Sequence, residues 1–245
     1  MEWFENESFW KDLYPYMFPE RRLLDAAGEV QKIVDLTGVS RGSVLDLCCG
    51  PGRHSVEFSL SGFLTTGVDR TGFLLDKARG HAAEKNAEVE WILSDMRDFR
   101  RPAAFDLIVN MFTAFGYFSE KSEDVKVLSL MVENLKPAGM AVIDVVGKEI
   151  IARVYQPAGR DRHDDGSVLV QHRTITDDWT RINNEWILIK DDSIKRFPFE
   201  HTLYSGQEQR DRMLQAGFSE VRLFGNLNGD SYDTKALRLV AVGTR

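Results

Sequence analysis

Glycines and acidic residues at three places in the sequence have the types and spacing of a ligand-binding site. Asp46 lies inside the apolar run 44–48, which is followed by Gly50-Pro51-Gly52, and Asp69 and Asp95 each follow a later apolar run. A buried strand that breaks at glycines and leads into a helix places a ligand at the carboxyl edge of a parallel sheet. The glycines let the backbone approach that ligand, and the helix N-terminus offers it unpaired N–H groups.

The spacing of the glycines distinguishes between classes of nucleotide ligand. A dinucleotide fingerprint has a third glycine, which allows close helix–strand packing beside a pyrophosphate, but this chain has Ser55 at that position. Asp69 is well placed to accept both hydroxyls of a ribose, and Asp95-Met96 to meet an adenine edge. The alternative for each of these aspartates is a helix N-cap. Their occurrence in consecutive strand–helix units favours an adenosyl ligand.

This succession of motifs resembles the class I S-adenosylmethionine-dependent methyltransferases, from about Val44 to Val146. The resemblance implies S-adenosyl-L-methionine as the cofactor and an α/β, Rossmann-like seven-stranded methyltransferase fold with a mostly parallel sheet. If the N-terminal segment forms a lid over this cofactor, Tyr14 and Arg22 are the candidate partners of its methionine carboxylate. The full set of expected cofactor-binding residues is Asp46, Cys49, Gly50, Gly52, Asp69, Arg70, Asp95, Met96, Asn110, Tyr14 and Arg22.

The elements that must position these residues follow from the hydrophobic pattern. Between residues 43 and 146, strand-like runs alternate with helical ones, which predicts a parallel sheet covered on both faces. The expected strands are 43–48, 64–68, 89–94, 105–111 and 140–146, and the expected helices are 53–61, 72–86 and 122–136. Pro137-Ala138-Gly139 is predicted to stop the last of these helices.

The pattern changes after Val146, where three strand-like runs predict an inserted antiparallel β meander. They are 167–176, 181–190 and 193–204, with turns at Asp177-Asp178 and Asp191-Asp192. Pro198 lacks an N–H group, so the third run is expected to be an edge or bulged strand. A helix at 205–216 and strands at 221–227 and 237–243 then complete the fold.

Four segments are therefore expected along the chain. Residues 1–38 form an N-terminal aromatic and helical lid, 39–147 the cofactor-binding core, 148–204 the inserted β cover over the substrate, and 205–245 a helix and strand pair that complete the core. The aromatic residues near the N-terminus could instead pad one edge of the sheet. The insertion could instead be a dimerisation arm.

The end of the fourth strand is expected to lie near the reacting methyl group. The segment 110–113 lacks both prolines of the Asn/Asp-Pro-Pro-Tyr/Phe sequence found in methylases that act on exocyclic amines of bases. Phe112, Phe115 and Tyr117 are expected to line the substrate site as an aromatic wall, together with His201. His201 and Tyr117 are the candidate catalytic residues, although a single histidine on an apolar face is commonly a core residue.

Charge and composition restrict the class of partner. A net charge of −7 argues against a broad nucleic-acid or anionic-membrane surface, and no apolar stretch is long enough to span a bilayer. The two cysteines, Cys48 and Cys49, are sequence neighbours, which favours a reduced, cytoplasmic chain. Paired aspartates occur only in separate turns or loops, where they are expected for backbone reasons, so no metal site is predicted.

We therefore expect a methyltransferase that acts on a small molecule, as a monomer or homodimer. The segments 197–204 and 224–242 look like those of sugar-amine N-methylating enzymes, but the sequence leaves open whether N, O, S or C is methylated. The alternatives are a methyltransferase for RNA or protein, a nicotinamide-binding oxidoreductase, and a protein that binds the cofactor without catalysis.

Overall fold

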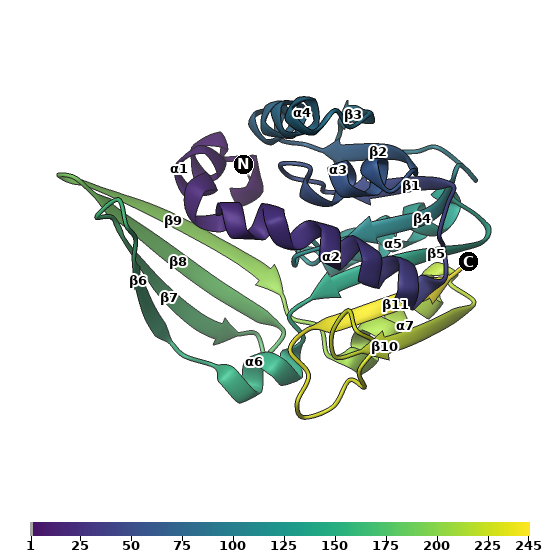
Figure 1. Ribbon diagram of the computed structural model, residues 1–245. Coiled ribbons are helices and arrows are strands. Elements are labelled where there is room, and N and C mark those ends of the chain that lie inside the picture. Colours follow the sequence, from purple (N-terminus) through teal and green to yellow (C-terminus); the bar gives the residue numbers. More distant parts are fainter. Residues whose placement is uncertain (1) are drawn as a thin grey trace.

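The main sheet has seven strands in the order β10-β11-β5-β4-β1-β2-β3, in a computed structural model that describes residues 2–245 (Figure 1). β1 pairs in parallel with β2 and β4, whereas β11 runs antiparallel between β5 and β10. This is the Rossmann-like methyltransferase sheet predicted from the sequence. Its strands are β1 (Ser43–Leu47), β2 (Leu64–Asp69), β3 (Val89–Leu93), β4 (Phe105–Asn110), β5 (Leu135–Val145), β10 (Glu220–Phe224) and β11 (Leu239–Thr244).

The central strands are apolar because helices cover both faces of the sheet. Val44 and Leu45, neighbours on β1 that point to opposite faces, are both fully buried. The helical elements are η1 (Trp3–Glu5), α1 (Glu7–Met17), α2 (Glu20–Thr37), α3 (Arg53–Leu60), α4 (Gly72–Lys85), α5 (Lys121–Asn134), α6 (Lys148–Val154) and α7 (Gly206–Ala216). α6 was not predicted, because its seven residues are too few to show a helical period.

The N-terminal helices divide into two groups with different neighbours. α2 crosses the front of the main sheet in Figure 1, and its Val30 and Ile33 pack in one core cluster with Val44 of β1. η1 and α1 instead lie beside the four-stranded sheet. The C-terminal half of the expected lid segment is therefore part of the cover of the main sheet, and a lid role for η1 and α1 stays a prediction.

The link between α5 and β5 differs from the sequence-based expectation. The helix ends at Asn134, and the strand begins at once with the pair Phe105–Leu135, before Pro137 is reached. The register then shifts between Phe105 and Leu107, and Ala138 has a positive φ of 62°. Burial of the Leu135 side chain in the core thus fixes the start of the strand, and proline sits in the irregularity that follows.

The second sheet has four antiparallel strands in the order β6-β7-β8-β9, where three were predicted. These are β6 (Ala158–Arg162), β7 (Val168–Thr176), β8 (Arg181–Lys190) and β9 (Ser193–Thr202). β6 escaped prediction because its five residues carry no apolar alternation. β9 is an edge strand, as the position of Pro198 required, and Asp177 and Asp191 occupy turns with φ of 51°.

The chain leaves the main sheet for the second sheet and returns to it at one place. The N–H of Lys148, at the start of α6, donates to the carbonyl of Tyr204 at 2.9 Å, and Thr202 N–H donates to the carbonyl of Gly116 at 2.7 Å. Aromatic rings of η1 and α1 pack against β9, with Phe9 5.8 Å from Phe197. The second sheet is thus an insertion whose inner face is covered by the N-terminal segment.

Candidate functional site

A cavity opens where β1, β2, β3 and β4 end, and residues of the N-terminal segment, among them Phe4, Trp10 and Phe18, form part of its wall. The sequence-predicted residues that line it are Asp46, Cys49, Gly50, Asp69, Arg70, Asp95, Met96, Phe112 and Tyr117. The other predicted residues, which do not line it, are Gly52, Asn110, Tyr14, Arg22, Phe115 and His201.

The turn after β1 brings backbone to the cavity at Gly50 but not at Gly52. Gly50 has a positive φ of 55°, and a notional Cβ there would make only an ordinary contact of 3.7 Å with the Phe18 ring. Gly52 also has a positive φ, but a Cβ there would come within 2.5 Å of Trp91. The second glycine therefore makes room for an indole ring against the helix start, and the first is the one that could let a ligand approach.

Asp46 and Ser55 form a buried pair under this turn. The carboxylate of Asp46 is 1% exposed and accepts a hydrogen bond of 2.6 Å from the Ser55 hydroxyl. Burial raises the pKa of Asp46, while His54, the Ser55 hydrogen bond and Arg53 oppose the shift. The serine that replaces the third glycine of a dinucleotide fingerprint thus supplies a hydroxyl that holds the strand carboxylate.

Asp69 ends β2 and connects two backbone segments at the cavity wall. Its Oδ2 accepts the N–H of Gly50 and its Oδ1 the N–H of Thr71, both at 2.8 Å. Burial raises the pKa of Asp69 to about 6, although these two hydrogen bonds oppose the shift. The carboxylate is therefore fixed in orientation, and each oxygen has a further lone pair for a hydroxyl donor.

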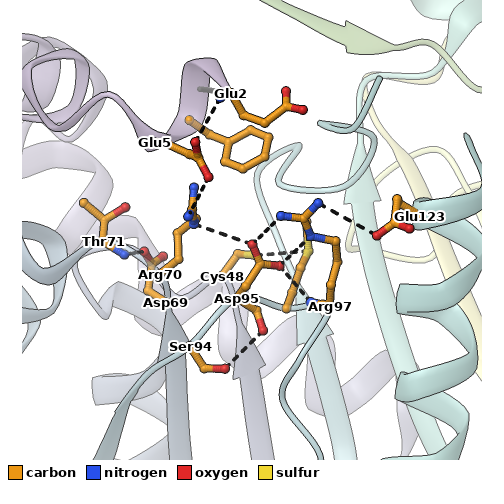
Figure 2. A network of polar contacts seen from close by, with 12 residues as sticks. Glu2, Glu5, Cys48, Asp69, Arg70, Thr71, Ser94, Asp95, Arg97 and Glu123 are labelled. Atoms are coloured by element: carbon orange, nitrogen blue, oxygen red, sulfur yellow. Dashed lines mark hydrogen bonds and ion pairs between the residues drawn. The ribbon is translucent and has the colours of Figure 1, made fainter. Parts of the chain in front are cut away.

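Asp95 is tied to arginines at the edge of the cavity (Figure 2). Arg97 donates to it from Nε and Nη2 at 2.9 and 2.8 Å, and Arg70 lies 3.6 Å from Oδ2. Burial opposes ionisation, but the hydrogen bonds from Arg97 outweigh it and lower the pKa of Asp95. The predicted adenine partner thus has its two oxygens engaged, and neighbouring Met96 offers the apolar surface.

The same arginines anchor the N-terminal cover. Arg70 pairs with Glu5 at 3.0 Å, and the Phe4 ring lies 5.1 Å from the Arg70 guanidinium and 5.9 Å from that of Arg97. The Trp10 indole N–H donates to the Phe4 carbonyl at 2.9 Å. Figure 2 shows η1 above the strand ends, joined to them through Glu5 and Arg70.

A second group of arginines surrounds Phe112, which follows β4. The guanidinium of Arg22 lies 4.1 Å from the centre of the Phe112 ring, and that of Arg53 lies 5.5 Å away. Arg22 lies behind this ring and donates to the Met17 carbonyl. Burial, Arg53 and Arg238 lower the pKa of Arg22, so this end of the cavity carries an excess of positive charge.

Glu29 on α2 neutralises part of that charge. It forms an ion pair with Arg53 and accepts a 2.7 Å hydrogen bond from Nε2 of the buried His54. Despite burial, the bonds from His54 and Arg53 lower the pKa of Glu29 to about 2. Arg53 and His54 both line the cavity, so α2 is joined to the ligand-binding turn through this carboxylate.

The predicted catalytic and substrate residues are only partly brought together. Tyr117 lines the cavity, where burial raises its pKa, and its ring lies 4.6 Å from Trp3. Phe115 is 1% exposed and packs against Tyr204 in the core. His201 lies on β9 outside the cavity lining, and burial and Arg181 lower its pKa to about 4. It is therefore a weak base at neutral pH.

Two predicted cofactor residues have structural partners instead of a place in the cavity wall. Tyr14 packs edge-to-face on Phe73, with ring centres 5.7 Å apart. Asn110 is fully buried and donates to the Leu47 carbonyl at 3.0 Å, which joins β4 to β1. In addition, no group of three or more His, Cys, Asp or Glu side chains within residues 2–245 could hold a metal ion. No helix in that range has the length and apolar character needed to cross a membrane.

Sequence reasoning missed several residues of the cavity wall. Arg53 and His54 directly follow the glycine turn, so their position next to Gly52 was the available signal. Thr71 and Phe118 likewise lie within two residues of predicted positions. Phe4, Trp10, Met17 and Phe18 were anticipated only as members of an aromatic N-terminal segment. Glu29 gave no signal, because its partners lie 24 and 25 residues along the chain.

Comparison with known proteins shows what this fold is similar to. Residues 44–139 match the family model described as a methyltransferase domain. The chain is 30% identical over 123 residues to the dTDP-3-amino-3,4,6-trideoxy-alpha-D-glucopyranose N,N-dimethyltransferase of Streptomyces venezuelae. That match covers 49% of this chain and 50% of the relative, so the chain matches about half of the length of that protein.

Solved structures extend the similarity in fold over most of the chain. The CcbJ methyltransferase from Streptomyces caelestis superposes with a TM-score of 0.78 at 19% identity, covering 89% of this chain and 88% of that one. The sugar N-methyltransferase KedS8 from Streptoalloteichus sp. gives 0.72 at 18% identity, with coverage of 96% and 92%.

Residues 44–139 match a methyltransferase domain, and the seven-stranded sheet has the fold of class I methyltransferases. The cavity fits S-adenosylmethionine, the cofactor expected from the sequence, in three observed respects. Gly50 leaves room for a ligand, Asp69 directs a carboxylate at the site, and the opposite end is positively charged around Phe112.

Proposed function

We propose that this protein binds S-adenosyl-L-methionine in the cavity and transfers its methyl group to a small molecule, with an amine of a sugar as the acceptor class. The observation that carries the proposal is the buried carboxylate of Asp69 at the cavity wall, hydrogen-bonded to Gly50 and Thr71. It has free lone pairs for two ribose hydroxyls. The amino-sugar acceptor is supported by the activity of the Streptomyces venezuelae relative, an N,N-dimethyltransferase of a dTDP-linked amino sugar.

Different parts of the site would hold different parts of the cofactor. Asp69 would hold the ribose and Met96 would contact the adenine, while Arg22, outside the cavity lining and behind Phe112, would attract the methionine carboxylate. The bound cofactor supplies an electrophilic methyl group on a sulfonium. Around it, the rings of Phe4, Tyr117 and Phe118 exclude water, which strengthens electrostatic interactions inside the cavity.

An acceptor that arrives with a free lone pair suits this site best. Much of the rate of an in-line displacement comes from positioning, and a protein base is needed only for a protonated nucleophile. Burial raises the pKa of Tyr117, and His201 lies outside the cavity lining. An amine attacks through its unprotonated fraction and releases a proton to solvent after the transfer, so it needs neither of them, which supports N-methylation over transfer to a hydroxyl.

The second sheet and η1 together cover the acceptor in this proposal. The support is the aromatic packing between them, where Trp3 lies 4.6 Å from Tyr117 and 5.3 Å from Phe199. Tyr117 belongs to the cavity wall and Phe199 to β9. An acceptor held between the two sheets would therefore meet the methyl group from the side of Tyr117.

Two experiments test the proposed function. Isothermal titration should give clear binding of S-adenosylhomocysteine and none of NADH; binding of NADH alone would replace the proposal with an oxidoreductase. A methyl-transfer assay with a panel of nucleotide-linked amino sugars, hydroxylated analogues and RNA should then give product with the amines. Product with the hydroxylated analogues or RNA alone would refute the acceptor class and leave the cofactor unaffected.

A further inference from the structure

Phe112 and Thr113, directly after Met111 at the end of β4, have an unusual backbone conformation. Both have a φ of 62°, in the left-handed region that bulky and β-branched residues avoid. Two such residues in succession persist only where the surrounding structure holds them in place, and such positions gather at ligand sites. The contacts that hold this turn therefore help to set the position of the cavity wall.

Asp144, near the end of β5, satisfies both backbone donors of the turn. Its Oδ2 accepts the N–H of Phe112 at 3.0 Å, and its main-chain carbonyl accepts the N–H of Thr113 at 2.8 Å. The Asp144 side chain is buried, so a carboxylate at this position needs a partner of opposite charge.

Arg238, just before β11, is that partner and also contacts the turn directly. Its Nε donates to Oδ1 of Asp144 at 2.6 Å and its Nη2 to Oδ2 at 2.9 Å. The same Nη2 lies 3.0 Å from the Thr113 hydroxyl and 3.2 Å from the Asp144 carbonyl. A planar guanidinium can make this paired contact and a lysine cannot, because the two N–H groups are fixed in one fork.

The conformation of the turn decides where the Phe112 ring lies. That ring lines the cavity, and Arg22 stacks on it at 4.1 Å. Arg22 donates a hydrogen bond to the Met17 carbonyl, so the aromatic face is its other support. A shift of the turn would therefore move both the wall and the cation behind it.

We propose that Arg238 is a positioning residue for the methionine end of the cofactor. Through Asp144 it holds Phe112 and Thr113 in the left-handed turn, and the turn holds the Phe112 ring, with Arg22 behind it, beside the proposed site of the methionine carboxylate. This inference rests on the proposed function, because it concerns the binding of one part of S-adenosylmethionine. Arg238 itself does not line the cavity.

The experiment compares two ligands on the full-length Arg238→Ala variant by isothermal titration. S-adenosylhomocysteine has the methionine part, whereas adenosine ends at the ribose that Asp69 is proposed to hold. We expect the Kd of S-adenosylhomocysteine to rise by about tenfold or more. Without Arg238, the strained left-handed conformation of the turn is no longer held in place. The Kd of adenosine should change by less than about twofold.

A second substitution tests whether Arg238 acts through the turn or through its charge. Thr113→Gly, introduced into the Arg238→Ala background, places at residue 113 the one residue type that adopts positive φ freely. The double variant should recover S-adenosylhomocysteine affinity to within about threefold of the unmodified protein. Arg222→Ala is the matched control, because it removes the same charge from an exposed position on β10 and should leave both ligands unaffected.

The outcomes that contradict the inference differ from the one that contradicts the proposed function. An unchanged affinity in Arg238→Ala, an equal loss for both ligands, or no recovery in the double variant would overturn the inference. Absence of S-adenosylhomocysteine binding in the unmodified protein would refute the proposed function and this inference with it. If Arg238→Ala does not fold, Arg238→Lys keeps the charge without the fork and should show the same selective loss on a smaller scale.

Discussion

The two ends of the cavity are built in different ways. At the edge of the main sheet, buried carboxylates are held by backbone N–H groups, a hydroxyl and arginines, as at Asp69, Asp46 and Asp95. Toward the second sheet the wall is aromatic at Tyr117, and Trp3 packs on that ring from outside the cavity lining. Directed hydrogen bonds fix atom positions, whereas ring packing tolerates changes in shape. In the proposed function, the first end would hold the cofactor and the second would lie beside the acceptor.

The largest effect is expected at the polar end. Asp69→Ala should weaken S-adenosylhomocysteine binding by roughly 10- to 150-fold, or about 1.5–3 kcal/mol, because it removes the acceptor for both ribose hydroxyls. Isothermal titration measures the loss, and Asp76→Ala, an exposed charge removal on α4, is the control. Normal affinity in Asp69→Ala together with a large drop in unfolding free energy would show that Asp69 serves only to hold Gly50 and Thr71.

The pH dependence of S-adenosylhomocysteine binding tests the same role of the Asp69 carboxylate. Burial raises the pKa of Asp69 to about 6 in the free protein, and only the ionised carboxylate accepts hydrogen bonds from both hydroxyls. Affinity should therefore fall by about tenfold from pH 7 to pH 5 as Asp69 takes up a proton. The free energy of unfolding of the free protein changes in the opposite direction. Because the pKa of Asp69 is raised in the folded state, this free energy increases as the pH falls through 6. A titration series on Asp69→Asn should be flat, and an equal slope in that variant would assign the effect to another group.

At the aromatic end we expect a smaller effect, on the KM for the acceptor instead of on cofactor affinity. Trp3→Ala should raise the KM for the acceptor by about fivefold through loss of ring packing on Tyr117 and Phe199, while the Kd of S-adenosylhomocysteine stays within about twofold. Steady-state kinetics and titration give the two values separately. Trp179→Ala, in the turn between β7 and β8 where the ring is exposed, is the matched control. A loss of cofactor affinity without a change in KM would show that Trp3 supports cofactor binding and not acceptor binding, which would contradict the proposed difference between the two ends.

The smallest effect is expected at His201, although it shares a strand face with Phe197 and Phe199. Because burial and Arg181 lower its pKa to about 4, the ring is neutral and a weak base at pH 7. His201→Asn should therefore reduce kcat by less than about threefold. A loss of 100-fold or more, accompanied by disappearance of an acidic limb from the pH profile, would make His201 the base after all.

The sequence by itself determined the order of the elements and the ligand edge of the sheet. Asp46, Asp69 and Asp95 each stand within or just after an apolar run, and the carboxyl ends of parallel strands meet at one edge. Their convergence on one cavity was therefore predictable from spacing alone. The same holds for the edge position of β9, because Pro198 lacks the N–H group that an inner strand needs.

Only the tertiary structure decided which of the candidate residues meet at that edge. The spacing treats Gly50 and Gly52 alike, yet Trp91 from β3 fills the space beside the second and leaves the first open. The pairs Glu29–Arg53 and Asp144–Arg238 join residues 24 and 94 positions apart. Such pairs depend on how helices and strands pack across the sheet, and local hydrophobic periodicity carries no information about side-chain partners at that distance.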